Sequence, residues 1–136
     1  MADGSAFGWH GDQTYLKLLP ANVSTDVYYT VPMLTANGAY ALQNTGASKF
    51  WWTVAIPRGM KATHFRVNSN VTKTVTLYEC EIGDNTTATS KGSGNTNTEI
   101  DITDVNYSAT NYLTIVVAFD AVNQQLWGGY VKIAPI

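Results

Sequence analysis

The sequence has few of the residues on which cross-linking and acid–base catalysis depend. It has one cysteine, Cys80, and two histidines, His10 and His64, among 136 residues. A single cysteine excludes an intrachain disulfide and any cysteine-based zinc site, and zinc needs three or four ligands. We therefore expect no metal or other cofactor, an inert buried thiol at Cys80, and an exposed histidine at position 64.

Charge is also scarce, which limits the partners that the protein can bind. Charged residues are 13% of the chain, against about 25% in ordinary domains, and the net charge is −2. The eight basic residues are scattered singly, so we expect no nucleic acid partner, because phosphate binding needs clustered cations. No apolar run approaches the roughly 20 residues of a membrane span, and residues 1–13 lack the features of a signal peptide. We expect that the protein does not associate with a membrane and that it is synthesised in a cytoplasm.

Short strand-like runs are what the sequence has instead. No segment longer than a few residues shows a helical apolar period, whereas turn residues separate many alternating or β-branched runs. This pattern predicts an all-β protein: a single-domain antiparallel β-sandwich, jelly-roll-like, with eight to ten short strands. We place the sandwich at residues 13–136 and expect residues 1–12, which are rich in glycine and small residues, to form an N-terminal arm.

The segment from Phe50 to Ile82 contains the strongest strand signal and predicts three consecutive strands paired as a meander. In its third run, Val75 and Leu77 share one parity and Cys80 the other, which indicates a β-bulge near Leu77 and Tyr78. Outside this segment we expect strands at 13–19, 27–31, 99–103, 112–119 and 130–136. Asn37-Gly38 should be the turn of a short ribbon at the edge of a sheet. Residues 83–98 should be mostly loop, with a short strand at 88–91. Pro32 should end a strand or confine it to an edge.

Few residues could perform catalysis or hold an ion. Glu79 and Glu81 share a strand face, about 6.6 Å apart by strand rise, which is within the range of glycosidase carboxylate pairs. The same pattern is typical of the outward face of a strand, which we favour. Asp101 and Asp104 suggest calcium ligands, but no complete acidic loop surrounds them. The Gly92–Gly94 run precedes no helix, so it lacks the dipole of a phosphate site. We therefore expect that the protein is not an enzyme.

The aromatic residues are the one group with several possible roles. The four tryptophans and eight tyrosines suit a core, a protein interface or a sugar-stacking platform, because each ring combines a large apolar area with a polar group. We expect Trp52 in the core. Phe7, Trp9 and His10 in the arm either pack on the domain itself or dock onto a neighbouring subunit. The candidates for contact with a partner are therefore Phe7, Trp9, His10, Trp51 and Trp127.

Several segments together resemble a family of small all-β proteins encoded by marine tailed bacteriophages. They are GWHGDQTYLKLLP (8–20), TVAIPRGMKATHFRV (53–67), TSKGSGNTNTEIDITDV (89–105), TNYLTIVV (110–117) and WGGYVKIAPI (127–136). The resemblance implies a virion component, and small β-domains in virions often decorate the head as trimers. It supplies no catalytic or ligand-binding residues that could be matched to this sequence.

Two functions follow from these observations as expectations. The first is a non-enzymatic capsid decoration protein on the virion surface, a homotrimer that stabilises the head by burying surface against the major capsid protein. The second is a carbohydrate- or receptor-binding β-sandwich of a tail fibre, with Trp51, Trp127 or nearby tyrosines stacking on sugars. A small hydrolase that uses Glu79 and Glu81 is the least favoured possibility.

Overall fold

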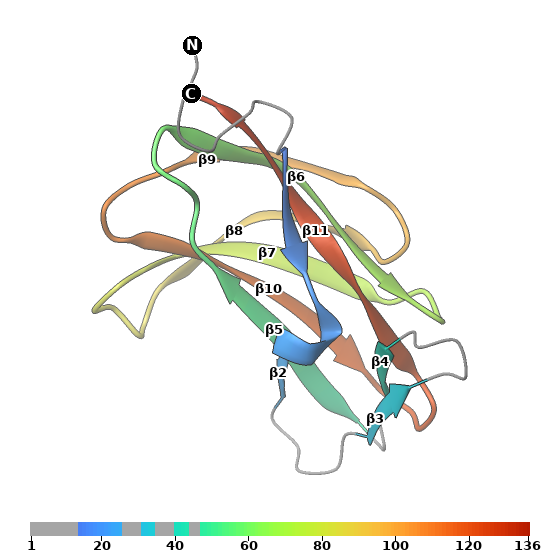
Figure 1. Cartoon of the computed structure of the whole chain (residues 1–136). Helices are drawn as coiled ribbons and strands as arrows, with labels where there is room; N and C mark the ends of the chain where they lie inside the picture. Colours follow the sequence, from blue (N-terminus) through green and yellow to red (C-terminus); the bar gives the residue numbers. More distant parts are fainter. Residues whose placement is uncertain (1–13, 26–30, 35–39, 44–46) are drawn as a thin grey trace.

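The protein folds as two antiparallel β-sheets packed face to face, which confirms the expected β-sandwich (Figure 1). The structure is a computed structural model and describes residues 14–25, 31–34, 40–43 and 47–136. These residues form eleven strands, more than the eight to ten expected, and one short 3₁₀ helix, η1 (Pro20–Asn22). No helix in these ranges is long and apolar enough to cross a membrane.

The six-stranded sheet is organised around the last strand of the chain. Its strands are β1 (Tyr15–Leu18), β3 (Val31–Leu34), β4 (Tyr40–Gln43), β6 (Met60–Ser69), β9 (Ile100–Asn106) and β11 (Gln125–Pro135). One edge of β11 pairs along its length with β6, and the other edge is shared between β1 and β4. β9 pairs with the far side of β6. The C-terminal segment is thus tied into the sheet, as expected.

The five-stranded sheet forms the second layer, in the order β2-β5-β10-β7-β8. Its strands are β2 (Ser24–Thr25), β5 (Ser48–Val54), β7 (Thr74–Glu81), β8 (Ala88–Asn95) and β10 (Asn111–Phe119). The nearly all-apolar run 112–119 was expected to be central in its sheet, and β10 does lie between β5 and β7.

The expected meander from Phe50 to Ile82 is wrong. β5 and β7 belong to the five-stranded sheet, whereas β6 belongs to the six-stranded sheet, so the chain crosses the sandwich twice in this segment (Figure 1). The strands themselves were located correctly. Their alternation shows which face each strand buries, but a strand can bury that face from either layer, and hence local sequence does not reveal its neighbours.

The core consists of alternate apolar residues from both sheets. Phe50 and Phe119 meet edge to face, with ring centroids 5.3 Å apart and planes inclined at 76°. Trp52 is buried as expected, and its Nε1 donates a 2.9 Å hydrogen bond to the carbonyl oxygen of Leu19, just before η1. Other side chains without exposed surface are Phe65, Val67, Val75, Leu77, Leu113, Ile115, Val117, Leu126 and Val131.

A register shift does occur beside Leu77 and Tyr78, but the extra residue is Lys91 on β8 rather than a residue of β7. β7 therefore keeps its own alternation, since its pairing with β10 is unbroken. Cys80 is buried as expected, yet it lies on the outer face of the sheet, where its Sγ is 3.6 Å from Thr114 Oγ1. The buried positions of β7 change parity between Leu77 and Cys80 because side chains are buried on both faces of the sheet at this point.

The short strand expected at 88–91 is present but longer, because residues 92–95, expected to be turn, continue it to form β8 (Ala88–Asn95). A Cβ atom at Gly92 would lie 2.5 Å from Ile102 Cγ2, and one at Gly94 would lie 2.9 Å from Ile100 Cγ1. The two glycines thus allow β8 to approach β9 across the sandwich. A Gly-Ser-Gly run is typical of a turn, but here it meets a packing requirement.

Two expectations concern the edge of the six-stranded sheet. β3 and β4 form the short ribbon predicted there, and among the described strands β3, which contains Pro32, pairs only with β4, as expected for an edge strand. Its turn, Asn37-Gly38, most of the strand expected at 27–31, and the N-terminal arm lie outside the described residues.

Replacement of Gly92 by alanine should destabilise the protein, because the new methyl group collides with the stiff side chain of Ile102. We expect a loss of about 1–3 kcal/mol in the free energy of unfolding, measured by urea denaturation. Asn95→Ala, at an exposed site on the same strand, is the matched control. Equal stability of the two variants would contradict the packing role of Gly92.

Candidate functional site

The residues expected to contact a partner do not form one surface. Phe7, Trp9 and His10 lie outside the described residues. Trp51 is half-buried on β5, opposite in parity to core residue Trp52, so it lies on the outer face of the five-stranded sheet. Trp127 is 50% exposed and belongs to β11 in the other sheet. The two tryptophans are therefore on different layers of the sandwich.

Trp127 points away from the core because of a bulge in β11. The register with β6 shifts between Leu126, which is fully buried, and Gly128. Gly128 has a φ of +105°, and a Cβ atom there would lie 2.7 Å from the carbonyl oxygen of Leu18. Trp127 Nε1 donates a 3.0 Å hydrogen bond to Gln125 Oε1. The bulge thus places a half-exposed indole on the surface, two residues beyond the end of the β1–β11 pairing.

The outer face of the six-stranded sheet gathers aromatic and charged side chains from four elements. On β11, Tyr130 and Lys132 alternate with the buried Val131 and Ile133 and hence point outward. The register places Tyr15 opposite Lys132, and Lys17 opposite Tyr130. On the other side, Arg66 is opposite Tyr130 and His64 is opposite Lys132. We call this surface the tyrosine face, defined by Tyr15, Lys17, His64, Arg66, Asn68, Glu99, Asp101, Tyr130 and Lys132.

The two tyrosines form the centre of this face. Tyr15 and Tyr130 are diagonal neighbours on adjacent strands, and their rings meet edge to face with centroids 4.8 Å apart and planes inclined at 79°. Tyr15 remains 48% exposed. The contact therefore fixes two aromatic rings while a large part of one of them stays open to a ligand.

Tyr130 is also held by a carboxylate from the far side of β6. Its hydroxyl donates a 2.7 Å hydrogen bond to Glu99 Oε2, just before β9. This bond lowers the pKa of Glu99, with smaller contributions from nearby Lys132, His64 and Arg66. The same bond, with burial and the Glu99 charge, raises the pKa of Tyr130 to about 12. Glu99 is thus a carboxylate at neutral pH and Tyr130 a neutral phenol.

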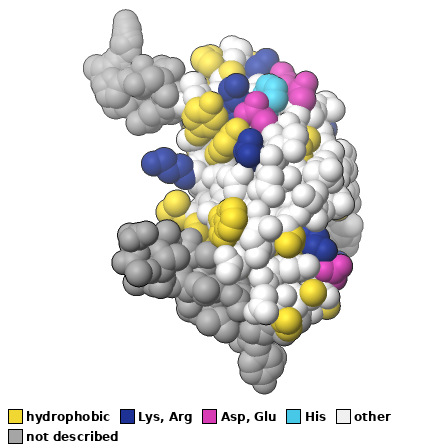
Figure 2. Space-filling model, turned by 90° about the vertical axis from the view of Figure 1, so that its right-hand side faces the viewer, with side chains coloured by type: hydrophobic (Ala, Val, Ile, Leu, Met, Phe, Trp, Pro, Cys, Tyr) yellow, Lys and Arg dark blue, Asp and Glu magenta, His cyan; other side chains and the backbone are white. Residues whose placement is uncertain are grey.

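Two further pairs of polar side chains on the tyrosine face are in contact. Arg66 Nε donates a 2.8 Å hydrogen bond to Asn68 Oδ1, and His64 Nε2 lies 3.6 Å from Asp101 Oδ1. Figure 2 shows this side of the molecule, where basic, acidic and hydrophobic side chains gather around the cyan histidine. The face combines apolar rings with oriented donors and acceptors.

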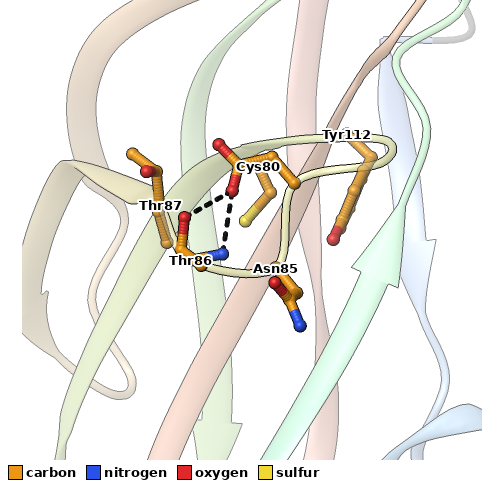
Figure 3. A pocket seen from close by; sticks show the side chains of 7 residues that line it. Cys80, Asn85, Thr86, Thr87 and Tyr112 are labelled. Atoms are coloured by element: carbon orange, nitrogen blue, oxygen red, sulfur yellow. Dashed lines mark hydrogen bonds between the residues drawn. The ribbon is translucent and has the colours of Figure 1, made fainter.

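A second candidate is a cavity of about 190 Å³ beneath the turn between β7 and β8. Cys80, Tyr112 and Ala88 line it together with turn residues 84–87, and Figure 3 shows Tyr112 at one side and Thr86 and Thr87 at the other. Asp84 accepts hydrogen bonds from the backbone nitrogen and hydroxyl of Thr86, which lower the pKa of Asp84. An open hollow of about 390 Å³ adjoins the cavity at Tyr112. This site presents one aromatic ring and mostly short side chains.

The two glutamates proposed as an acid–base pair are engaged separately. Glu79 accepts a 2.8 Å hydrogen bond from Asn111 Nδ2 and lies 3.5 Å from Lys91 Nζ. Glu81 accepts a 2.6 Å hydrogen bond from Thr110 Oγ1. Both residues thus fix the start of β10 to the end of β7, which is a structural role.

The aspartates considered as calcium ligands lie in β9, not in a turn, and each faces a basic residue of β6. Asp104 lies 3.0 Å from Lys61 Nζ, and Asp101 pairs with His64. Contrary to the expected exposed side chain, His64 is half-buried. Within the described ranges, no group of three or more histidine, cysteine, aspartate or glutamate residues could hold a metal ion.

Comparison with known proteins identifies similar folds but no family. No family model matches the sequence, and no curated protein does so significantly. A solved carbohydrate-binding module, from family 36 and part of a multidomain xylanase from the hindgut metagenome of Trinervitermes trinervoides, has a TM-score of 0.50 and 20% identity over 90% of this chain and 98% of its own. The C-terminal family 6 module of a laminarinase from Zobellia galactanivorans has a TM-score of 0.48 and 17% sequence identity, and the match covers 87% of this chain and 98% of that module. A family 61 module solved with β-1,4-galactotriose has a TM-score of 0.46 and 16% identity, and the match covers 84% of this chain and 87% of that module. At these identities the similarity shows the β-sandwich fold alone.

Loss of the Glu99 carboxylate should lower the pKa of Tyr130 from about 12 toward its ordinary value of 10. NMR of protein with ¹³C-labelled tyrosine rings, titrated with base, measures this in the Glu99→Ala variant, with Asp101→Ala as the control. Because the folded-state pKa is raised, the contact stabilises the fold fully below pH 10 and loses that effect as the pH rises toward 12. An unchanged Tyr130 titration in Glu99→Ala would contradict the assigned contact.

Proposed function

We propose that this protein is a non-catalytic carbohydrate-binding module whose ligand surface is the tyrosine face. Sugar rings have one or two faces of C–H groups, which pack on aromatic rings, and a rim of hydroxyl groups, which need directional partners. The exposed ring of Tyr15, fixed against Tyr130, supplies the first requirement. Glu99, bonded to Tyr130, and the Arg66–Asn68 pair on β6 supply donors and acceptors on the Tyr130 side of the ring pair.

The observation that carries the proposal is that the Tyr15–Tyr130 ring pair is held in place by the hydrogen bond from Tyr130 to Glu99. Because Tyr130 is held by Tyr15 on one side and Glu99 on the other, its ring is oriented before any ligand arrives. Pre-orientation reduces the entropy that binding must offset. An open sheet face also suits a polymer, which a small enclosed cavity does not.

The similar solved fold also supports the proposal. The module with a TM-score of 0.50 is a carbohydrate-binding domain of a xylanase, and such domains act by binding alone. The separate hydrogen bonds of Glu79 and Glu81 agree with a binding role, because neither residue is arranged as the partner of the other.

The proposal corresponds to the second expectation from the sequence, with a different set of residues. Sugar stacking was expected at Trp51, Trp127 or nearby tyrosines, and the tyrosine face centres on two tyrosines, Tyr15 and Tyr130, that were not named individually. Trp127 follows a bulge on the same strand as Tyr130 and could extend the surface. Capsid decoration, a trimer, contact with the major capsid protein and a location in the virion stay predictions, and no feature of the described residues favours them.

Replacement of Tyr15 by alanine should weaken glycan binding at least tenfold, equivalent to about 1.4 kcal/mol of binding free energy. A glycan microarray identifies the ligand, and isothermal titration calorimetry then compares the variants. The matched control is Tyr112→Ala, which removes the one ring of the cavity under the β7–β8 turn. Thermal denaturation establishes that both variants are folded.

The control decides between the two surfaces. Loss of affinity in Tyr15→Ala with normal affinity in Tyr112→Ala supports the tyrosine face. The reverse result would move the site to the cavity near Cys80. No binding to any glycan by the wild-type protein would overturn the proposed function itself.

A further inference from the structure

We propose that the ligand of the tyrosine face is an acidic glycan, with carboxylate or sulfate groups on its sugar rings. This inference rests on the proposed function and names its substrate class. It comes from the positions of the charged residues around the ring pair, which sequence order alone does not reveal.

The two tyrosines and two lysines of β1 and β11 form a square. Tyr15 is paired with Lys132, and Lys17 is paired with Tyr130, so the ring pair occupies one diagonal and the two ammonium groups occupy the other. Directly opposed residues on antiparallel strands have Cβ atoms about 4.5–5.5 Å apart. A sugar stacked on Tyr15 would therefore lie between two cations. Arg66, opposite Tyr130 on β6, adds a third.

The carboxylates of this face lie at one side of it and are already engaged. Glu99 and Asp101 belong to β9 or its entry and contact Tyr130 and His64, respectively. By contrast, Lys17 and Lys132 have no carboxylate within 4.0 Å among the described residues, and Arg66 bonds the neutral amide of Asn68. Among the described residues, the ammonium groups of Lys17 and Lys132 therefore have no close anionic partner, although Glu99 interacts with Lys132 and Arg66 at longer range.

This local excess contrasts with the protein as a whole, which has a net charge of −2. The protein as a whole therefore does not attract polyanions, and the binding of an anion depends on the cations of the tyrosine face. An arginine presents a planar fork that matches carboxylate and sulfate oxygens, and a lysine presents a point charge. Both kinds of group are present around the ring pair.

A glycan fits this surface better than the other linear polyanion, single-stranded nucleic acid. The carboxylates of Glu99 and Asp101 can accept hydrogen bonds from sugar hydroxyl groups, which every unit of a glycan offers and the sugar–phosphate backbone of DNA does not. Three cations are also few for phosphate binding. An acidic glycan offers hydroxyl donors to the carboxylates and anionic groups to the lysines.

The experiment is affinity gel electrophoresis followed by calorimetry with four polymers. They are a polyuronate, a sulfated galactan, the same galactan after desulfation, and single-stranded DNA. The test variant is Lys17→Gln with Lys132→Gln. The matched control is Lys49→Gln with Lys73→Gln, which removes the same charge from β5 and from the approach to β7 on the other sheet.

We expect the polyuronate or the sulfated galactan to bind, and the wild-type affinity to fall with added salt. The test variant should lose at least tenfold in affinity for that polymer, and the control variant should lose less than threefold. The two acidic polymers distinguish carboxylate from sulfate recognition. Stronger binding of DNA than of either acidic glycan would overturn the inference in favour of a nucleic acid.

The outcomes separate this inference from the proposed function. Equal binding of the neutral and sulfated galactans, unaffected by the lysine substitutions, would overturn the acidic ligand while leaving a carbohydrate-binding module. Binding of none of the glycans would overturn both. A loss of equal size in the two lysine variants would show a general charge effect and would also overturn the inference.

Discussion

The pairing of β11 with β6 on one edge and with β1 on the other is the constraint on which the rest of the structure depends. Because side chains alternate along a strand, this register sends Val131 and Ile133 into the core and Tyr130 and Lys132 to the outer face. A slip of one residue would exchange the two sets. Burial of the core therefore also fixes the position of every group on the tyrosine face.

The candidate site lies mostly on strands, and only Glu99 comes from the connection that precedes β9. Its rings and cations lie on paired strands, and the hydrogen bond from Tyr130 to Glu99 crosses β6 and joins the face to the edge of β9. The bulge at Gly128 serves the same surface, since it turns Trp127 outward while Leu126 stays buried. Sites on regular elements are positioned more rigidly than sites on loops, which suits recognition of a stiff sugar polymer.

The sequence predicts the strands well and their partners poorly. Alternation located β5, β6, β9 and β10, because each buries one face, but it could not assign β6 to the opposite sheet from β5. The alternation of residues 13–19 placed Tyr15 and Lys17 on one face. Their meeting with Tyr130 and Lys132 depends on pairing between segments more than a hundred residues apart. Tryptophan side chains are the largest aromatic groups and were therefore the first candidates for sugar stacking, but the aromatic pair on the outer face consists of Tyr15 and Tyr130.

The most direct test of this account is chemical-shift mapping of the ¹⁵N-labelled protein during titration with the glycan that binds best. Specific binding at the tyrosine face predicts shifts concentrated in β1, in residues 127–132 of β11, in residues 64–68 of β6 and near Glu99. Shifts confined to the turn between β7 and β8 and to Tyr112, with β1 and β11 unaffected, would contradict it.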